Sequence, residues 1–319
     1  DITLTGDTRI GAASTAGQTI GFNINGNILD DTVGGHELEF HSDVSDTDFF
    51  RLNGAGTYTG STTITGGTLY LSNADGRALY SNTDVDSDII LDPRSGGTAK
   101  LWFENDNQLG SNVNLRFNVD HATSYAKVAI NGTDQTIGNI ISAGNEPSRN
   151  TIEQLPSPSG SQSSTLTITQ TVDNTYTGIF RDSETNSSNN TLNVVKNGDA
   201  TLRLALGAGD FYSGSTDVND GKLAFDWVTD SRKPQTSSIN VFKDDTAGTS
   251  GILEFKVPTG EFWQMDTDVT FGGDGTFVKV GDGDIDWPEN ISATFDFDAG
   301  AKILVNAGTL WGSSFDDED

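Results

Sequence analysis

Short bursts of alternating apolar and polar residues occur along the whole chain. Examples are 62–65 (TTIT), 165–169 (TLTIT) and 294–297 (TFDF), and Gly, Asn and Asp cluster between such bursts. Alternation with a period of two predicts half-buried β-strands, and Gly, Asn and Asp predict the turns between them. No stretch of ~12 residues shows the 3.6-residue period of an amphipathic helix. We therefore expect an all-β protein with almost no helix.

A block of sequence recurs within the chain. Residues 57–71 (TYTGSTTITGGTLYL) align without a gap with 211–225 (FYSGSTDVNDGKLAF). A partial third copy aligns 305–311 with 218–224 and 278–282 with 195–199, at nearly equal offsets of 87 and 83 residues. The strand spacing suits a sandwich, a barrel or a β-solenoid, and reuse of a multi-strand block favours the solenoid.

A solenoid coil of ~20 to 25 residues cannot bury its inner face alone, so coils must stack. With a spacing of ~4.8 Å between coils, the chain would form roughly 13 coils and a rod ~60 Å long. We expect Arg203 and Lys222 to point outward. The alternation predicts an inward apolar stripe of Ile64, Leu69, Leu71, Leu202, Leu204, Val218, Leu223, Phe225, Ile303, Val305 and Leu310.

The strand pattern divides the chain into four segments. Residues 1–144 are the first half of the β-helix, and 165–312 are the second half with the clearest repeats. Between them, 145–164 contain Pro, Ser and Gly with little alternation, which predicts an excursion loop or a boundary. Residues 313–319 form an acidic tail.

The repeated block resembles a known family. Asn193–Leu204 followed by Tyr212–Leu223 is similar to the autotransporter-associated β-strand repeat, which reads roughly L-x-K-x-G-x-G-T-L-x-L and then N-x-Y-x-G-x-T-x-x-x-x-G-x-L. Gly54–Asn73 resembles the latter half, and 134–140 and 176–180 resemble its shorter phrases, so about half of the chain is covered.

The resemblance implies a right-handed parallel β-helix, as in the passenger regions of secreted bacterial surface proteins, and it implies no reaction. That family usually continues into a membrane-embedded β-barrel or a sorting tail. We therefore expect either that such a segment has been removed from beyond Asp319 or that export follows another route. The strand-like start at Asp1–Thr5 is what a processed mature terminus would show.

Charge and composition narrow the range of partners. The chain has 46 acidic and 18 basic residues, a formal net charge of −28, and no Cys. Nucleic acids and anionic membranes are not expected partners, because both require an excess of Lys and Arg. No apolar run approaches ~18 residues, so direct membrane insertion is not expected. The lack of Cys excludes disulfides and cysteine-bound zinc.

One His-Glu motif invites a metalloprotease interpretation. Residues 36–41 read HELEFH, which is one residue too long for the H-E-x-x-H zinc motif. In a strand, His36, Leu38 and Phe40 would face one side, and Glu37, Glu39 and His41 the other. We therefore expect an ordinary half-buried strand here and no metal centre.

The acidic clusters are candidates for calcium sites. In Asp282-Gly283-Asp284-Ile285-Asp286, carboxylates alternate as at the start of a calcium loop, but Trp287 stands where a Gly is required. Alignment of Ile285 with Leu202 places Ile285 and Trp287 inward and the three Asp side chains outward. The same solvated outer face is expected for 84–88, 296–298 and the tail, so any Ca²⁺ binding should be diffuse.

No catalytic, cofactor-binding or metal-binding residues are assigned. Asp is so frequent that a pair of Asp residues carries no information about glycan chemistry, and nucleophile-elbow, Walker and Rossmann motifs are missing. The five Trp residues, at 102, 227, 263, 287 and 311, could stack on sugars, but four follow the apolar alternation and are expected to fill the core or its edge.

We predict an extracellular, secreted or cell-surface bacterial protein with a structural or adhesive role, forming a rod, appendage or coat, and not an enzyme. Two alternatives remain: a self-polymerising filament or sheath subunit, and a carbohydrate-active enzyme or glycan-binding module on the same fold. The expected partner is the protein itself, through end-to-end or edge contacts. Surface glycans or other cells are further candidates.

Overall fold

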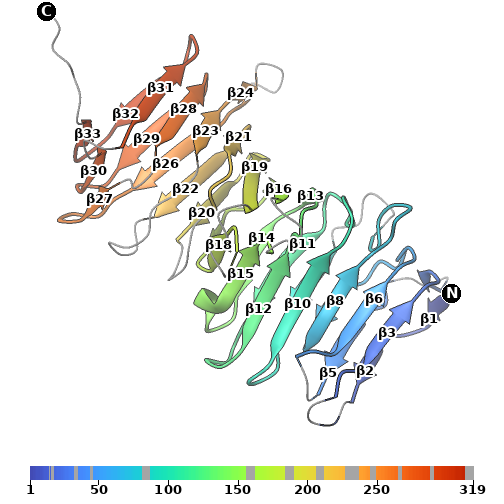
Figure 1. The fold of residues 1–319 in the computed structure, drawn as a ribbon. Helices are drawn as coiled ribbons and strands as arrows, with labels where there is room; N and C mark the ends of the chain where they lie inside the picture. Colours follow the sequence, from blue (N-terminus) through green and yellow to red (C-terminus); the bar gives the residue numbers. More distant parts are fainter. Residues whose placement is uncertain are drawn as a thin grey trace, which may run out of the picture.

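The computed structural model describes residues 1–13, 15, 18–31, 35–43, 46–80, 87–155, 162–183, 190–205, 212–226, 237–244, 249–264, 268–287 and 291–312. These residues form a parallel β-solenoid of about 10 turns. The strands lie across the long axis of the rod, with β1 (Ile2–Leu4) at one end and β33 (Leu310–Gly312) at the other (Figure 1). The fold predicted from the alternation and the repeats is confirmed.

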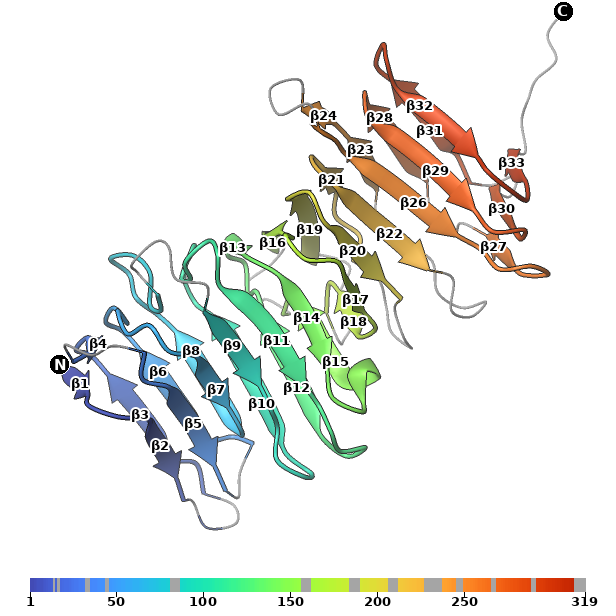
Figure 2. The same cartoon turned by 180° about the vertical axis from the view of Figure 1, so that it is seen from behind.

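Two sheets form the N-terminal half, and they lie on different sides of the rod (Figures 1 and 2). Sheet I contains β3 (Gly21–Ile24), β6 (Phe49–Leu52), β8 (Gly67–Leu71), β10 (Thr98–Phe103), β12 (Tyr125–Ala129), β15 (Asn150–Glu153) and β18 (Ile179–Arg181). Sheet II contains β2 (Thr8–Ala12), β5 (Leu38–Ser42), β7 (Thr62–Ile64), β9 (Asp88–Leu91), β11 (Asn114–Asn118) and β14 (Ile140–Ala143).

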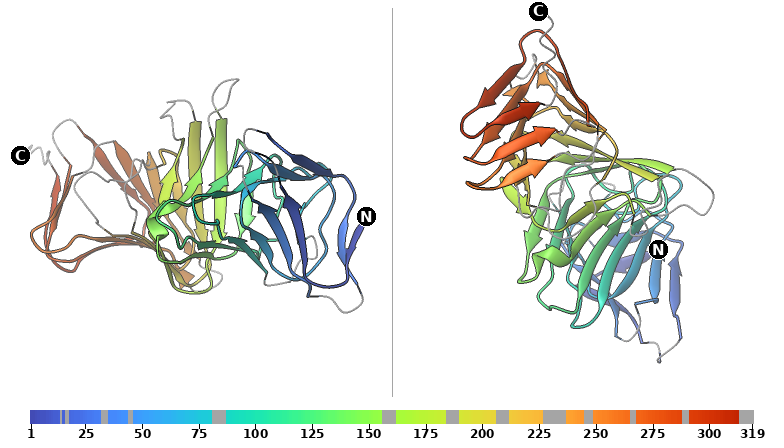
Figure 3. Two further views of the ribbon diagram at one scale, coloured as in Figure 1. Left: turned by 90° about the horizontal axis from the view of Figure 1, so that it is seen from below. Right: turned by 60° about the vertical axis from the view of Figure 1, so that its left-hand side comes forward.

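Two further sheets form the C-terminal half (Figure 3). Sheet III contains β13 (Gln135–Ile137), β16 (Gln162–Thr169), β19 (Asn190–Asn197), β21 (Thr216–Val218), β23 (Ser238–Val241), β28 (Val269–Gly273) and β31 (Ala293–Phe297). Sheet IV contains β17 (Asn174–Tyr176), β20 (Thr201–Leu204), β22 (Lys222–Asp226), β26 (Ile252–Lys256), β29 (Thr276–Val280) and β32 (Lys302–Val305).

Smaller elements complete the coils. β1 pairs with β4 (Ile28–Asp30), and β30 (Asp284–Trp287) lies between β27 (Phe262–Gln264) and β33. The short pair β24 (Lys243–Asp244) and β25 (Thr249–Ser250) is antiparallel, unlike the sheets. The 3-10 turn η1 (Pro147–Arg149) precedes β15. Within the described residues, no helix is long and apolar enough to cross a membrane.

The predicted number of coils was too high, since the structure has about 10 turns and not 13. Coils can be longer than the assumed ~20 to 25 residues. Gly67 pairs with Ala99, and Ile239 pairs with Phe271, each 32 residues further along the chain (99 − 67 and 271 − 239). The extra residues lie in turns and loops. They increase the number of residues in a coil, but each coil still lengthens the rod by only one strand spacing.

The predicted inward stripe is correct wherever another coil lies on both sides. Side chains from Ile64 to Phe225 in that stripe are at most 1% exposed. Ile303 and Val305 continue the inward columns of Phe277 and Lys279, but they are not buried, since they are 46% and 45% exposed, and Leu310 is only half-buried. β32 and β33 are the outermost strands of their sheets, so their side chains contact a coil on one side only.

The weakly patterned stretch 145–164 contains regular structure. It holds η1, β15 and the beginning of β16, while 156–161 lie outside the described residues. The two halves overlap around this region, because β13 before it already belongs to sheet III and β18 after it still belongs to sheet I. The division of the chain into segments stays a prediction, and the acidic tail 313–319 also lies outside the described residues.

Candidate functional site

The Tyr-x-Gly-x-Thr part of the repeat packs one coil against the next. Tyr58 and Tyr212 are both 1% exposed, and their hydroxyl groups lie 2.5 Å and 2.9 Å from the Oγ1 atoms of Thr62 and Thr216. Burial raises the pKa of both tyrosines far above the usual value. The hydrogen bond satisfies a hydroxyl that would otherwise be buried without a partner.

The Gly of this motif is needed because backbones approach closely. A Cβ at Gly60 would overlap with the carbonyl oxygen of His36 in the preceding coil, and a Cβ at Gly214 would overlap with that of Leu192. Neither glycine has a positive φ, so space is the reason for Gly here and not backbone conformation. The motif therefore serves coil stacking.

The Lys of the repeat points inward, which the sequence analysis did not predict. Lys196 of β19 is 0% exposed, and its ammonium donates hydrogen bonds to the carbonyl oxygens of Asn197 (2.9 Å), Gly198 (2.7 Å) and Asp220 (3.0 Å). Asp220 belongs to the next coil, so the ammonium joins two coils. Burial lowers the pKa of Lys196 to about 8. The signal was available, since Lys196 has the same parity as the inward Leu192.

Lys279 of β29 occupies the equivalent position and repeats this arrangement. Its Nζ donates to the carbonyl oxygens of Gly281 (2.5 Å) and Ala307 (2.8 Å), and Ala307 again lies in the next coil. Burial lowers the pKa of Lys279 as well. Two repeat copies thus use a buried ammonium as a structural tie between backbones.

Many Asp and Asn side chains also join neighbouring coils. Asp284, one of the calcium candidates, accepts a hydrogen bond from the backbone N–H of Thr309 at 2.8 Å, and Asp282 accepts one from the Thr259 hydroxyl at 3.0 Å. Ile285 and Trp287 are buried, as predicted. Other side chains that accept a backbone N–H of another coil include Asp1, Asp7, Asn27, Asp30, Asp106, Asp120, Asp134, Asp173, Asn193 and Asp268. The abundance of Asp thus has a structural cause beyond a solvated face.

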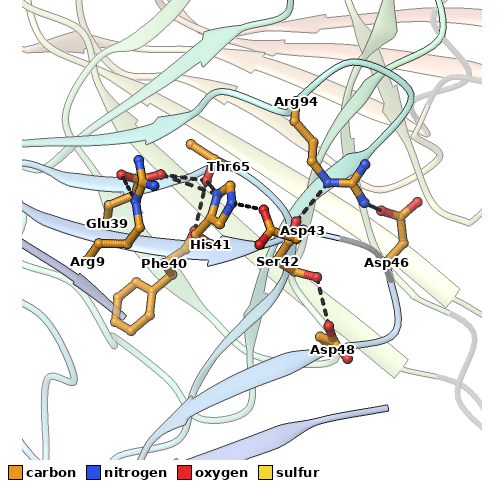
Figure 4. Close-up of polar contacts among 10 residues, drawn as sticks. All are labelled: Arg9, Glu39, Phe40, His41, Ser42, Asp43, Asp46, Asp48, Thr65 and Arg94. Carbon is orange, nitrogen blue, oxygen red and sulfur yellow. Dashed lines mark hydrogen bonds and ion pairs between the residues drawn. The ribbon is translucent and has the colours of Figure 1, made fainter. Parts of the chain in front are cut away.

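Residues 38–41 of the HELEFH segment lie in β5, and the outward side chains of this strand enter a polar network (Figure 4). Leu38 and Phe40 are buried, while Glu39 and His41 face outward, as the alternation predicted. The Nε2 atom of His41 lies 2.6 Å from Asp43 Oδ1, and its Nδ1 atom lies 2.7 Å from Thr65 Oγ1.

The network continues from Thr65 across the sheet. The Thr65 hydroxyl donates to Glu39 Oε1 at 2.9 Å, and Arg9 Nε donates to Glu39 Oε2 at 2.7 Å (Figure 4). His36 does not take part, since its Nε2 lies 3.1 Å from Asp31 Oδ1. Because its two His residues bond to different carboxylates, the motif forms no shared metal site. The described residues contain no group of three or more His, Cys, Asp or Glu placed to hold a metal ion.

A second set of contacts anchors the turn after β5. Asp48 is fully buried and accepts hydrogen bonds from the Ser42 hydroxyl and the Ile20 backbone N–H, both at 2.8 Å. Arg94 Nε donates to the Ser42 carbonyl oxygen at 2.7 Å, and its guanidinium lies 3.8 Å from Asp46 (Figure 4). These groups are saturated by the protein and hold the coil in place.

An open pocket of about 490 Å³ lies on the outer face beside this network. Glu39, Thr65 and Asp92 line it, and burial raises the pKa of Asp92. A carboxyl group with a raised pKa near a second carboxylate is an arrangement that glycosidases use. The hydroxyl–imidazole–carboxylate series Thr65–His41–Asp43 resembles a nucleophile triad in outline, but the Thr65 hydroxyl also lies 2.9 Å from Glu39 Oε1, a second acceptor that competes with His41 for its proton.

The tryptophans divide between core and surface. Trp263 and Trp287 are buried in the core, whereas Trp311 in the outermost strand β33 is 55% exposed. Trp102 lies on the outer face of β10, half-buried against Tyr70, with 5.2 Å between the ring centroids. Trp227 lies outside the described residues.

The comparison with known families agrees with these contacts. The family described as Passenger-associated-transport-repeat matches residues 50–71 and 194–225. No curated protein matches the chain. The matched segments include the buried Tyr58 and Tyr212, the close-packed Gly60 and Gly214, and the inward Lys196. The chain thus carries two segments similar to this repeat on a β-solenoid, and together they support a repeat protein of the autotransporter passenger type.

Proposed function

We propose that this chain is an extracellular rod of a bacterial surface protein, with a structural or adhesive role. The proposal rests on the structural roles of the repeat residues. The inward Lys and the close-packed Gly join one coil to the next, the Tyr-Thr pair is buried within its coil, and none of them lines the pocket beside Glu39. A sequence selected for stacking produces length and a repetitive surface.

The location is tested on intact cells of the source bacterium. An antibody raised against the purified chain should label unpermeabilised cells, and external protease should remove that label. A cytoplasmic protein in the same cells provides the control, because it should be labelled only after permeabilisation. Labelling of this protein only after lysis would contradict the proposal.

We further propose that the rod is not an enzyme. Thr65 and Glu39 are engaged with each other and with His41 and Arg9. The direct test is incubation with a panel of neutral and acidic polysaccharides, followed by assays for reducing ends and for unsaturated products. We expect no turnover. Turnover that disappears in Glu39→Gln or Asp92→Asn but persists in Asp106→Asn, a structural Asp, would overturn this view.

Self-association through the ends of the rod is a second proposal. At one end, Ile303, Leu304 and Trp311 are 46%, 44% and 55% exposed, and at the other, Ile2 and Phe22 are 37% and 39% exposed. Both ends of the described part therefore present apolar side chains beside strand edges with which no described strand pairs, and a head-to-tail contact with a second copy would cover both.

Sedimentation at high salt tests this contact, because salt screens the repulsion between highly acidic copies. We expect wild type to associate and Ile303→Asp to remain monomeric. The matched control is Val172→Asp, which adds the same charge at a side chain that is 61% exposed between β16 and β17. Wild-type protein that stays monomeric, or equal association of wild type and Ile303→Asp, would show that the ends are covered by something other than a second copy.

A further inference from the structure

The first and the last described coils of the rod are built in the same way. β1, β2 and β3 form the first coil, β31, β32 and β33 form the last, and the two coils lie at opposite ends of the rod (Figure 1). We propose that the last coil of one copy stacks on the first coil of a second copy, so that all three sides of the rod continue in parallel across the junction. The arrangement rests on the self-association through the ends proposed above, and it specifies which strands meet.

Two coils in the middle of the chain show which sheets share a side of the rod. The coil β13–β14–β15 visits sheets III, II and I in that order, and the coil β16–β17–β18 visits sheets III, IV and I. Sheet IV therefore continues the side of sheet II. β1 precedes sheet II as β13 does, so it lies on the side of sheet III, and β33 follows sheet IV as β18 does, so it lies on the side of sheet I. Each strand of the last coil thus has a counterpart on the same side in the first coil.

Apolar side chains belong to inward columns in every strand of both end coils. The strand register shows this, because the partners of these residues in the neighbouring coil are buried. They are Ile2 in β1, Ile10 in β2, and Phe22 and Ile24 in β3 at one end, and Phe295 and Phe297 in β31, Ile303 and Val305 in β32, and Leu310 in β33 at the other. Stacking of two copies would bring one apolar row against another on each side and remove both from water.

An exposed aromatic ring lies at the end of a stack in each of the two coils. Phe22 stacks on Phe50 with 5.7 Å between the ring centroids and 3° between the planes, and Phe295 stacks on Phe271 at 5.1 Å and 11°. Both outer rings are 39% exposed. Because each ring is parallel to a ring of the coil behind it, its second face points out of the rod. These distances are close to the ~4.8 Å between paired strands, so a side chain of a further coil fits against that face.

The free strand edges favour contact between unlike ends. The outer edges of β1, β2 and β3, and those of β31, β32 and β33, pair with no described strand. Apart from β24 with β25, the described strands pair in parallel, and stacking the last coil on the first keeps that direction. Contact between two identical ends would instead place the strands antiparallel. A head-to-tail contact need not close into a ring, so it can add further copies in the same way.

Cross-linking of single-cysteine variants tests the arrangement, since the chain has no Cys of its own. Thr3→Cys in β1 and Thr294→Cys in β31 mark one side of the rod, and Gly11→Cys in β2 and Leu304→Cys in β32 mark another. All four positions are exposed, and a Cβ at Gly11 meets only the His41 carbonyl oxygen, at 3.9 Å. In equimolar mixtures at high salt, we expect a short bismaleimide to link the two variants of each side.

The mixture of Thr3→Cys with Leu304→Cys is the matched control, because these positions lie on different sides of the rod. We expect several-fold less linked dimer there than in either same-side mixture. Equal linkage in crossed and same-side mixtures, or strong linkage within one variant alone, would overturn the continuation of the sheets. Sedimentation of the same mixtures separates this result from failure of self-association itself. Association without same-side links overturns only the proposed arrangement, whereas strictly monomeric protein overturns both.

Discussion

Replacing Leu223 by Ala tests the stacked core directly. Leu223 of β22 is 0% exposed, and its register partners are Leu202 in β20 and Leu253 in β26. The same inward column continues to Phe277 in β29 and then to Ile303 in β32. Leu223 therefore lies in the middle of a column whose last member is half-exposed.

The expected loss of stability has two parts. Removing three carbon atoms from a fully buried side chain costs about 2.4 kcal/mol, at ~0.8 kcal/mol for each carbon. The cavity adds to this cost, and collapse is limited because the main-chain hydrogen bonds of β20 and β26 fix the backbones on both sides. We expect a total of about 3 to 4 kcal/mol, within the range of buried Leu→Ala changes.

Ile303→Ala is the matched control, because it removes a similar side chain from the same column. Ile303 is 46% exposed, so we expect a loss of only about 1 kcal/mol. Urea unfolding followed by circular dichroism gives the two changes in unfolding free energy, and hydrogen exchange of β20 to β26 shows where the structure opens. A loss below ~0.5 kcal/mol for Leu223→Ala, or one no larger than that of Ile303→Ala, would refute the inward register.

Three further predictions concern the turns and the charges. Gly60→Ala should lower the urea midpoint strongly, because a Cβ at this position overlaps with a carbonyl oxygen. Gly6→Ala is the control and should be neutral, since no other atoms lie within 4 Å of a Cβ at that position. Equal effects of the two changes would contradict the close-approach argument. The folded-state pKa of Lys196 is lowered from 10.5 to about 8, so the folded protein binds fewer protons between these values. The Lys196 contribution to stability should rise with pH across this window, and a constant stability difference between wild type and Lys196→Met from pH 8 to 9.5 would count against it. Calcium should stabilise the protein by screening its negative charges, without a dedicated site. Titration calorimetry would contradict this if it finds one submicromolar site that is lost in the double variant Asp282→Asn, Asp284→Asn.

The local pattern was sufficient for the fold class and for the inward face of most strands. Alternation decides which side chains share a face, because successive side chains of a strand point to opposite sides. That rule placed Leu202, Leu223 and Ile285 inward and Glu39 and His41 outward, and the structure agrees. The recurrence of a multi-strand block is also visible in the sequence by itself, and it favoured a solenoid over a sandwich.

One inward residue, a lysine, was not assigned a direction from the sequence. Lys196 follows the inward parity of Leu192 and Val194, yet a lysine is rarely buried without a partner. Its partners are the carbonyl oxygens of its own turn and of Asp220 in the next coil. A sequence cannot display an acceptor that exists only when two coils are stacked.

The tertiary structure alone decided where the column ends and which outward residues meet. Ile303 has the same pattern as Leu223, but it is exposed because no described strand follows β32 in its sheet. Arg51, Tyr70 and Trp102 are far apart in the sequence and are brought into one column by the register of β6, β8 and β10. Alternation along a strand is a local property, whereas burial at an end and contact across strands depend on which coil lies next to which. Loops of variable length set that order, and no local pattern encodes it.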